Sequence, residues 1–296
     1  MEYDILPEFH KYAKIRMPVN PRILQAANVM MPVIQHGRNL YPGCLEHKRI
    51  MFRNFTANMY FPAGRNPEKF LLYCHGGAFL MKAAAYHKNL VQRYAMGAGC
   101  AVLFPDYRLA PKDPFPAQIQ DCVQAYRWLL KKYHPEKIVV GGDSAGAALA
   151  AGIALYTLKK GLRVPDAAML IYPMLDSRMS TESMKKYTDT PLWNSVQNRK
   201  AWALYADENN LHNPFASPME ARDLRGFPQT YLETAEYDCL HDEGIAFAHR
   251  LEESGVSVAQ NETRQTIHGY DIAENSDYVK VQMRRRISYL KGIYLA

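Results

Sequence analysis

One short segment combines a nucleophile with the local context that would expose it. Gly142-Asp143-Ser144-Ala145-Gly146 directly follows the apolar run KIVVG and opens an Ala-rich stretch with helical character. A serine between two glycines at a strand–turn–helix junction is typical of a nucleophile elbow. The glycines leave room for a tight turn, and the serine side chain projects above the sheet. The alternative, a serine that serves only as the N-cap of the helix, is disfavoured by this context of strand, sharp turn and helix.

Two further residues could activate this serine, whose hydroxyl is a poor nucleophile without a base. Asp238 follows the predicted strand TYLET, and His268 follows the last predicted strand. The chain order serine, acid, histidine is the order expected for an elbow serine. We expect His268 to accept the Ser144 proton and Asp238 to orient the imidazole. Asp242 and Glu243 lie at the start of a helix, where the helix dipole favours acids without any catalytic role.

A small-residue loop could stabilise the negative charge of a tetrahedral intermediate. His75-Gly76-Gly77-Ala78-Phe79 follows the apolar run FLLYC. Its backbone N–H groups, together with that of Ala145, could form an oxyanion hole. We interpret His75 as a residue that fixes the loop rather than as a second base.

The elements that must position these residues alternate along the chain. Continuous apolar runs separated by amphipathic helical stretches predict a mostly parallel sheet covered on both faces. Two short strands, 50–54 and 58–61, precede the runs as a pair, which gives eight strands. The apolar runs are 70–74, 101–105, 137–140, 168–172, 230–234 and 256–259, and the helical stretches include 118–133, 144–160 and 244–254.

Two segments interrupt this alternation. Residues 1–45 suggest short helices without a strand, and the polar, aromatic stretch 175–215 suggests an insertion. We expect both to form a helical cap over one α/β domain, 1–296. Six aromatic residues fit either an apolar substrate pocket or the core of the cap: Phe79, Tyr187, Trp193, Trp202, Phe215 and Tyr270.

The composition is that of an ordinary globular protein, with 48% hydrophobic and 22% charged residues among 296. The net charge of +7 does not predict a nucleic-acid partner, because the basic residues are dispersed. The densest run, Arg284 to Arg286, is expected on the solvent-facing side of an amphipathic terminal helix. Its apolar side would contain Met283, Ile287, Leu290 and Tyr294.

The cysteines and apolar runs favour a cytoplasmic protein without a membrane span. The five cysteines (Cys44, Cys74, Cys100, Cys122 and Cys239) are odd in number and widely spaced, which suits reduced thiols better than disulfides or a zinc site. Cys74 and Cys122 lie in apolar segments and are expected in the core. The N-terminus has early acids and no sustained apolar run, unlike a secretory signal. The longest nearly apolar run, 145–158, is too short to span a bilayer.

Together these motifs resemble the hormone-sensitive-lipase family of esterases, also called the bacterial GDXG lipolytic family, which has the α/β-hydrolase fold. The resemblance covers residues 70–272, with HGGAF at 75–79, DYRLAPKDPFPAQIQD at 106–121, GGDSAG at 141–146, EYDCLHDEG at 236–244 and HGY at 268–270. It implies a helical cap and a catalytic triad of Ser144, Asp238 and His268. It also implies oxyanion donors at Gly77, Ala78 and Ala145.

The sequence departs from the family pattern at two positions. Ala78 stands where the family usually has a third loop glycine, and Cys239 stands where proline usually follows the acid. Alanine keeps its N–H but disfavours positive φ, so we expect the oxyanion hole to be kept if Ala78 has φ below zero. The first 45 residues match no motif.

The predicted activity is therefore hydrolysis of short-chain acyl or aryl carboxylic esters through an acyl-enzyme. No metal or organic cofactor is implied, and the expected partner is a small-molecule ester. A peptidase or amidase on the same scaffold, a related dehydratase and a non-catalytic ligand-binding protein of this fold are the alternatives. Acetylated sugars, aryl acetates and short lipids all remain candidate substrates, and the sequence does not indicate the oligomeric state.

Overall fold

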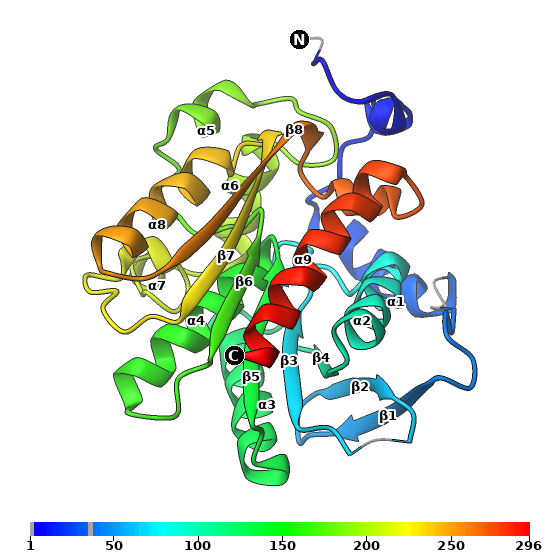
Figure 1. Cartoon of the computed structure of the whole chain (residues 1–296). Helices are drawn as coiled ribbons and strands as arrows, with labels where there is room; N and C mark the ends of the chain where they lie inside the picture. Colours follow the sequence, from blue (N-terminus) through cyan, green and yellow to red (C-terminus); the bar gives the residue numbers. More distant parts are fainter. Residues whose placement is uncertain (1–2, 35–37, 65) are drawn as a thin grey trace.

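An eight-stranded sheet forms the centre of the computed structural model, which describes residues 3–34, 38–64 and 66–296 (Figure 1). The strands lie in the order β1-β2-β4-β3-β5-β6-β7-β8, with β2 antiparallel to β1 and β4 and the remaining pairs parallel. The predicted fold class is confirmed. The strands are β1 Leu45–Met51, β2 Thr56–Pro62, β3 Lys69–Cys74, β4 Ala101–Asp106, β5 Lys137–Asp143, β6 Ala167–Ile171, β7 Gln229–Tyr237 and β8 Val258–Ile267.

The two edge strands are where the predicted boundaries were wrong. Strand β1 begins five residues before the predicted start, and β8 extends eight residues past the predicted end. Both strands carry exposed polar side chains, such as Lys48 in β1 and Gln260 in β8. A strand at a sheet edge lacks the continuous apolar run that marks a central strand, so its ends cannot be predicted from hydrophobicity.

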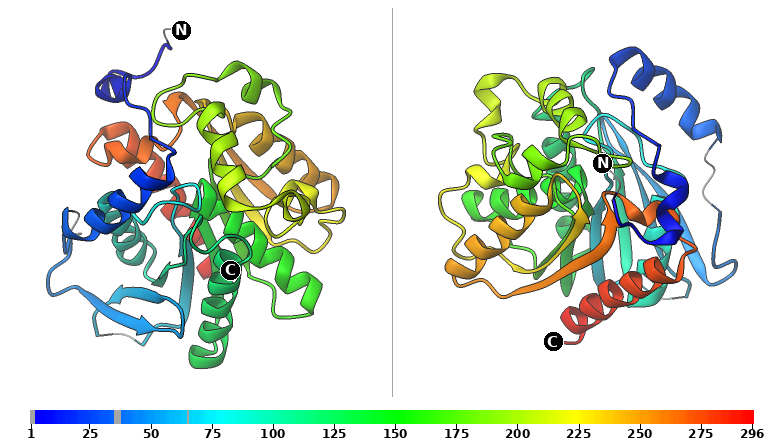
Figure 2. Two further views of the ribbon diagram at one scale, coloured as in Figure 1. Left: turned by 180° about the vertical axis from the view of Figure 1, so that it is seen from behind. Right: turned by 90° about the horizontal axis from the view of Figure 1, so that it is seen from above.

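Helices cover both faces of the sheet, as Figures 1 and 2 show. Helices α2 (Ala85–Ala98) and α9 (Asp277–Leu295) pack on one face, and α3 (Ala117–Tyr133), α4 (Ala145–Lys160) and α8 (His241–Glu253) pack on the other. A hydrophobic core lies on each face of the sheet, and alternate residues of the central strands point into one core or the other. Leu72 and Val140 belong to one core, and Leu71 and Val139 belong to the other.

The terminal helix contradicts part of the prediction for the basic run. Arg284 and Arg285 are exposed, as expected, but Arg286 is completely buried. Its position continues the spacing of Met283 and Leu290, which places all three side chains on the face of α9 that packs on the sheet. The guanidinium is satisfied there by two buried carboxylates, Glu233 and Asp271.

Shorter helices gather beyond the carboxyl ends of the parallel strands. The N-terminal segment contacts the insertion directly: Leu192 N–H donates to the Ile15 carbonyl at 2.8 Å, and Met17 N–H donates to the Leu192 carbonyl at 3.1 Å. Assigning 1–45 and 175–215 to a cap remains a prediction. These elements are η1 Pro7–Tyr12, α1 Pro21–Ile34, α5 Glu182–Lys186, α6 Ser195–Tyr205, α7 Glu208–Leu211, η2 Pro218–Glu220 and η3 Tyr270–Ala273.

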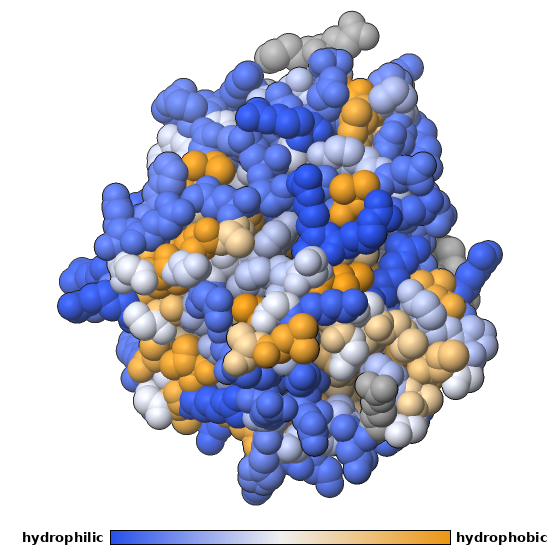
Figure 3. All heavy atoms as spheres, viewed as in Figure 1, coloured by the Kyte–Doolittle hydropathy of each residue, from blue (hydrophilic) through white to orange (hydrophobic). Residues whose placement is uncertain are grey.

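The surface is mostly hydrophilic on the face that Figure 3 shows, where hydrophobic residues form small separate groups. Among the described residues, no helix combines the length and the apolar character needed to cross a bilayer.

Candidate active site

The loop between β5 and α4 forces Ser144 into an unusual backbone conformation. Its φ of 54° and ψ of −121° place it at a sharp strand-to-helix turn, and its N–H donates to the Ile171 carbonyl at 2.8 Å. A Cβ on Gly146 would lie 2.0 Å from the Cys74 carbonyl oxygen, and one on Gly142 would lie 2.4 Å from the Gly146 backbone. Only glycine fits at these two positions, which explains the spacing of the motif.

The three side chains predicted to form a triad lie in hydrogen-bonding contact. Ser144 Oγ is 2.9 Å from His268 Nε2, and His268 Nδ1 is 2.6 Å from Asp238 Oδ2. Asp238 follows β7 and His268 follows β8, so both lie at the carboxyl ends of parallel strands, where catalytic groups of α/β sheets gather. Asp238 is fully buried and also accepts a hydrogen bond from the Leu240 N–H at 2.9 Å.

The two neighbouring acids bind backbone groups instead of His268. Asp242 Oδ2 accepts from the Ser183 N–H at 2.7 Å. Glu243 Oε1 accepts from the Leu175 N–H at 2.6 Å and from the Asp176 N–H at 3.2 Å. Burial raises the pKa of the Glu243 carboxyl well above its ordinary value. The helix dipole alone therefore does not account for Glu243, which ties α8 to the segment after β6.

The loop after β3 adopts left-handed backbone angles at three successive residues. The φ values are 113° at Gly77, 57° at Ala78 and 63° at Phe79. Ala78 therefore does not have the negative φ that is the expected condition for keeping the oxyanion hole. The loop is anchored to Asp143, because the Gly76 N–H donates to Asp143 Oδ2 at 3.1 Å. A Cβ at Gly76 would lie 2.2 Å from that oxygen, so a larger residue would disturb this contact.

The backbone amides predicted to form the oxyanion hole are available for a ligand. Within the part of the chain that the structure describes, no acceptor is found for the N–H groups of Gly77, Ala78 and Ala145. Ala145 is the first residue of α4, where an amide has no partner within the helix. Gly77 and Ala78 line the same hollow as Ser144.

A buried network beneath the loop fixes its position. The His75 ring stacks on Tyr107 with centroids 4.3 Å apart, and its Nδ1 lies 2.7 Å from the Gly76 carbonyl oxygen. Burial, with a smaller effect of His87, lowers the pKa of His75 to about 4, so the ring is neutral near pH 7. These contacts agree with a structural role for His75.

Asp143 holds the loop beside Ser144, a contact that the sequence did not reveal. It receives hydrogen bonds from Tyr73 Oη at 3.0 Å and from the Gly76 N–H, and His87 Nε2 lies 3.1 Å away. Burial by itself would raise the pKa of Asp143, but His87 and the hydrogen bonds hold it below its ordinary value. The charged carboxylate thus joins the elbow to the neighbouring loop. Its place next to Ser144 in the motif was the only available signal.

The hollow above Ser144 has a volume of about 370 Å³ and largely apolar walls. Of the six aromatic residues considered for a pocket, only Trp193 lines it. Phe79 instead stacks on Tyr205 at 3.7 Å, and Tyr270 donates to Glu233 in the core. The remaining walls, which the sequence did not reveal, include Met17, Ile23, Leu24, Ala27, Met81, Tyr86, Leu192 and Ile272.

No cluster of three or more His, Cys, Asp or Glu residues that could hold a metal ion occurs in the described ranges.

Comparison with known proteins identifies the family. A family model described as the alpha/beta hydrolase fold matches residues 71–272. The chain belongs to the α/β-hydrolase family. The match begins within β3 and ends just after the His268 loop, so it contains Ser144, Asp238, His268 and the three predicted oxyanion donors, but not the part of the hollow formed by residues 17–27.

Several relatives of this chain are named as esterases. Esterase LipI of Mycobacterium tuberculosis is 35% identical over 209 residues, which cover 68% of this chain and 65% of that protein. An arylesterase of Saccharolobus solfataricus is 30% identical over 72% of this chain and 71% of its own length. An acetyl-hydrolase of Streptomyces hygroscopicus is 32% identical over the same shares. The predicted class of enzyme, a serine esterase, is confirmed.

Solved structures agree over nearly the whole chain. A bacterial heroin esterase superposes with a TM-score of 0.89 at 28% identity, covering 98% of each chain. An esterase from the bacterial hormone-sensitive lipase family superposes with a TM-score of 0.83 at 27% identity, covering 97% of this chain and 98% of that one. The resemblance to this esterase family is confirmed.

Proposed function

We propose that this α/β hydrolase cleaves short-chain acyl or aryl carboxylic esters with Ser144 as nucleophile, His268 as general base and acid, and Asp238 as the group that orients His268. The observation that supports the proposal most strongly is the unbroken chain of contacts, 2.9 Å from Ser144 Oγ to His268 and 2.6 Å from His268 to Asp238. These distances suit proton transfer without rearrangement.

The reaction would proceed in two steps. Ser144 Oγ attacks the ester carbonyl carbon while its proton moves to His268 Nε2. The N–H groups of Gly77, Ala78 and Ala145 stabilise the oxyanion, and His268 then returns the proton to the departing alcohol oxygen. In the second step a water gives its proton to His268, attacks the acyl-enzyme and releases the acid. The buried Asp238 carboxylate stabilises the imidazolium in both steps.

The preference for short acyl or aryl groups rests on the size and lining of the hollow. Its 370 Å³ lies near the lower end of the range for small-molecule sites. The apolar side chains of Ile23 and Leu24 in α1 and of Trp193 in the insertion close around Ser144 and limit the length of an acyl chain. The names of two relatives, an arylesterase and an acetyl-hydrolase, point to the same substrate class.

A chain-length series of nitrophenyl esters, measured beside a nitrophenyl amide, tests both reaction and substrate. We expect kcat/KM to be highest for the acetyl or butyryl ester and the amide to be cleaved far more slowly. Faster turnover of a sixteen-carbon than of a four-carbon ester would refute the short-chain proposal. Faster turnover of the amide would favour the amidase alternative.

Covalent labelling tests the nucleophile separately from the substrate. A phosphonate should label Ser144 and no other serine, and the label should disappear in both Ser144→Ala and His268→Gln. Labelling that persists in Ser144→Ala would refute the assignment.

A cytoplasmic location is part of the proposal. Its support is that all five cysteines are free, including Cys74 and Cys122, whose sulfur atoms lie 3.6 Å apart in the core without a bond between them.

A further inference from the structure

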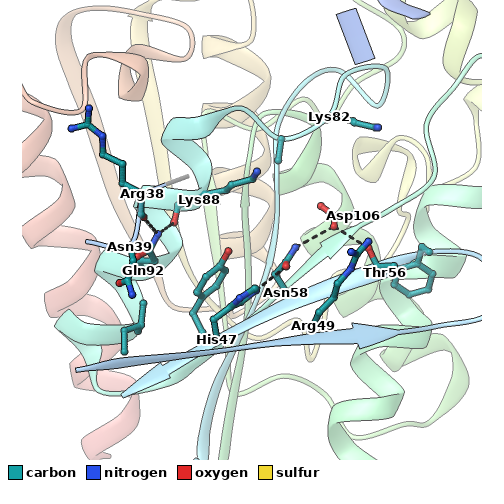
Figure 4. A pocket seen from close by; sticks show the side chains of 14 residues that line it. Arg38, Asn39, His47, Arg49, Thr56, Asn58, Lys82, Lys88, Gln92 and Asp106 are labelled. Atoms are coloured by element: carbon teal, nitrogen blue, oxygen red, sulfur yellow. Dashed lines mark hydrogen bonds between the residues drawn. The ribbon is translucent and has the colours of Figure 1, made fainter. Parts of the chain in front are cut away.

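A second hollow, separate from the site above Ser144, lies between the hairpin β1–β2 and helix α2 (Figure 4). Its volume is about 690 Å³, and of the residues that the structure describes only Lys82 lines both hollows. The floor consists of alternate side chains of the two strands, His47 and Arg49 from β1 and Asn58 and Tyr60 from β2, which the register places on one face of the sheet. We call this hollow the basic cavity.

The basic cavity gathers positive charge around a single acid. Four cationic side chains line it: Arg38, Arg49, Lys82 and Lys88. Among the described residues, Asp106 at the end of β4 is the only carboxylate in the lining. Within the described residues, neither Arg49 nor Lys82 forms a salt bridge. Cations held around a concave surface repel one another and raise the local concentration of anions, so a ligand with two negative charges would offset most of the excess positive charge.

The floor offers hydrogen bonds that a bare anion would not use. Asp106 Oδ2 accepts from Thr56 Oγ1 and from Asn58 Nδ2, both at 3.1 Å, which ties the carboxylate at the end of β4 to strand β2 in Figure 4. A carboxylate has acceptor sites for further donors, and ligand hydroxyls can fill them. The His47 ring stacks on Tyr60 with centroids 4.8 Å apart beside this group. An acid on the floor and cations around it therefore suit a molecule with hydroxyls at one end and an anionic group at the other.

We propose that the basic cavity binds a small phosphate monoester that carries hydroxyl groups. Arg49, Lys82 and Lys88 contact the phosphate, and Asp106 accepts a hydrogen bond from a ligand hydroxyl. Binding does not require the ester-hydrolysis machinery, because Ser144 and His268 lie in the other hollow.

Isothermal titration calorimetry at low ionic strength tests this site with glucose 6-phosphate, inorganic phosphate and glucose as probes. We expect glucose 6-phosphate to bind at one site and more tightly than inorganic phosphate, and glucose to give no measurable heat. The double variant Arg49→Gln/Lys88→Gln should weaken glucose 6-phosphate binding about tenfold or more, because charge-assisted hydrogen bonds to phosphate are lost.

A matched control distinguishes binding in the basic cavity from general electrostatic attraction to a positively charged protein. Lys159→Gln/Lys160→Gln removes the same charge from the exposed end of α4, so affinity should change by less than about twofold if the site is local. Turnover of nitrophenyl acetate should stay at the wild-type level in both double variants, which shows that each is folded.

Asp106→Asn is expected to strengthen binding of one probe, a result that an unfolded variant could not give. Removing this negative charge should tighten inorganic phosphate and abolish the advantage of glucose 6-phosphate, since the hydroxyl acceptor is weakened. Equal losses in the two double variants, or no binding of either phosphate probe, would overturn the proposal. The proposal would also be overturned if the protein bound anionic lipid vesicles but neither phosphate probe, and if Arg49→Gln/Lys88→Gln abolished that binding to vesicles. Ser144→Ala should bind glucose 6-phosphate normally, which keeps this test independent of the esterase proposal.

Discussion

Replacing the buried Arg286 by methionine should be among the most damaging substitutions outside the active site. In the structure, Arg286 Nη1 donates to both oxygens of Asp271 at 2.9 and 3.0 Å, and Arg286 Nη2 donates to Tyr270 Oη at 2.8 Å. The guanidinium also binds both oxygens of Glu233. Methionine fills much of the volume but leaves two carboxylates without their counter-charge at a site with no access to water.

The expected loss of unfolding free energy depends on which partner of the ion pair is removed. Breaking a buried ion pair by deleting one member typically costs about 3–5 kcal/mol, because the remaining charge stays desolvated. Unfolding entropy scales with chain length, so for a protein of this size that loss corresponds to a fall in Tm of about 5–8 °C. Arg285→Met is the matched control: its exposed guanidinium contacts Asn261 at 2.8 Å, and its loss should cost less than about 0.5 kcal/mol.

The pH dependence of the damage distinguishes stranded carboxylates from a packing defect. In the wild type, burial opposes ionisation of Glu233, but Arg286 holds the pKa of that carboxyl below its ordinary value. Without Arg286, burial should raise this pKa above that of the unfolded chain. An acid with a raised folded pKa loses stability as pH rises, so the deficit should be larger at about pH 8 than at about pH 5.

Urea unfolding of the wild type and both variants at these two pH values provides the measurement. A deficit of Arg286→Met that is the same at both pH values would show that packing, rather than charge, causes it. A deficit no larger than that of Arg285→Met would refute the reasoning altogether. Turnover should fall only modestly, although Asp271 also accepts from Tyr172 Oη at 2.7 Å and the Tyr172 ring lies 5.0 Å from His268.

Five further substitutions test the candidate site. Asp238→Asn should lower turnover by about 10⁴, the drop known for the triad acid of a serine protease, whereas Asp242→Asn should keep most of it; the reverse pattern in a nitrophenyl acetate assay would show that the acid is misassigned. Gly146→Ala should destabilise the fold by about 1–3 kcal/mol and abolish turnover, because its Cβ would overlap the Cys74 carbonyl; a fully active variant would contradict the elbow geometry. Ala78→Gly should retain turnover and gain up to about 1 kcal/mol in urea unfolding, since glycine adopts the 57° φ without strain. Glu243→Gln should gain stability relative to the wild type as pH rises from about 5 to 8, because the raised pKa of Glu243 makes its ionisation unfavourable; a constant difference across this range would count against a buried, protonated acid.

The central strands and the elbow could be predicted because their signals are local. Strand β5 is a continuous apolar run buried by helices on both faces, and the elbow is recognisable from five consecutive residues, although its glycines are required by contacts that include Cys74 at the end of β3. The places of Asp238 and His268 followed from topology, since parallel strands all end at the same edge of the sheet.

The wrong predictions arose where distant parts of the chain override a local preference. Helical spacing alone could not reveal that Arg286 faces the sheet, because its burial depends on Glu233 and Asp271 from other elements. Alanine disfavours positive φ, yet Ala78 adopts it in a loop that is tied to Asp143 through the preceding Gly76. Burial of Glu243 likewise depends on backbone amides that follow β6.

The same distinction explains why the reaction was easier to predict than the substrate. The reacting groups lie on strand ends, whose arrangement is common to the fold, but the hollow above them is enclosed by α1 and by the segment around Trp193. The segments that carry these two walls meet through backbone hydrogen bonds between Leu192 and residues Ile15 and Met17. Such bonds can form whatever side chains these residues carry. No local pattern encodes that contact. Substrate preference should therefore change with Ile23, Leu24 and Trp193 while the triad and its contacts stay the same.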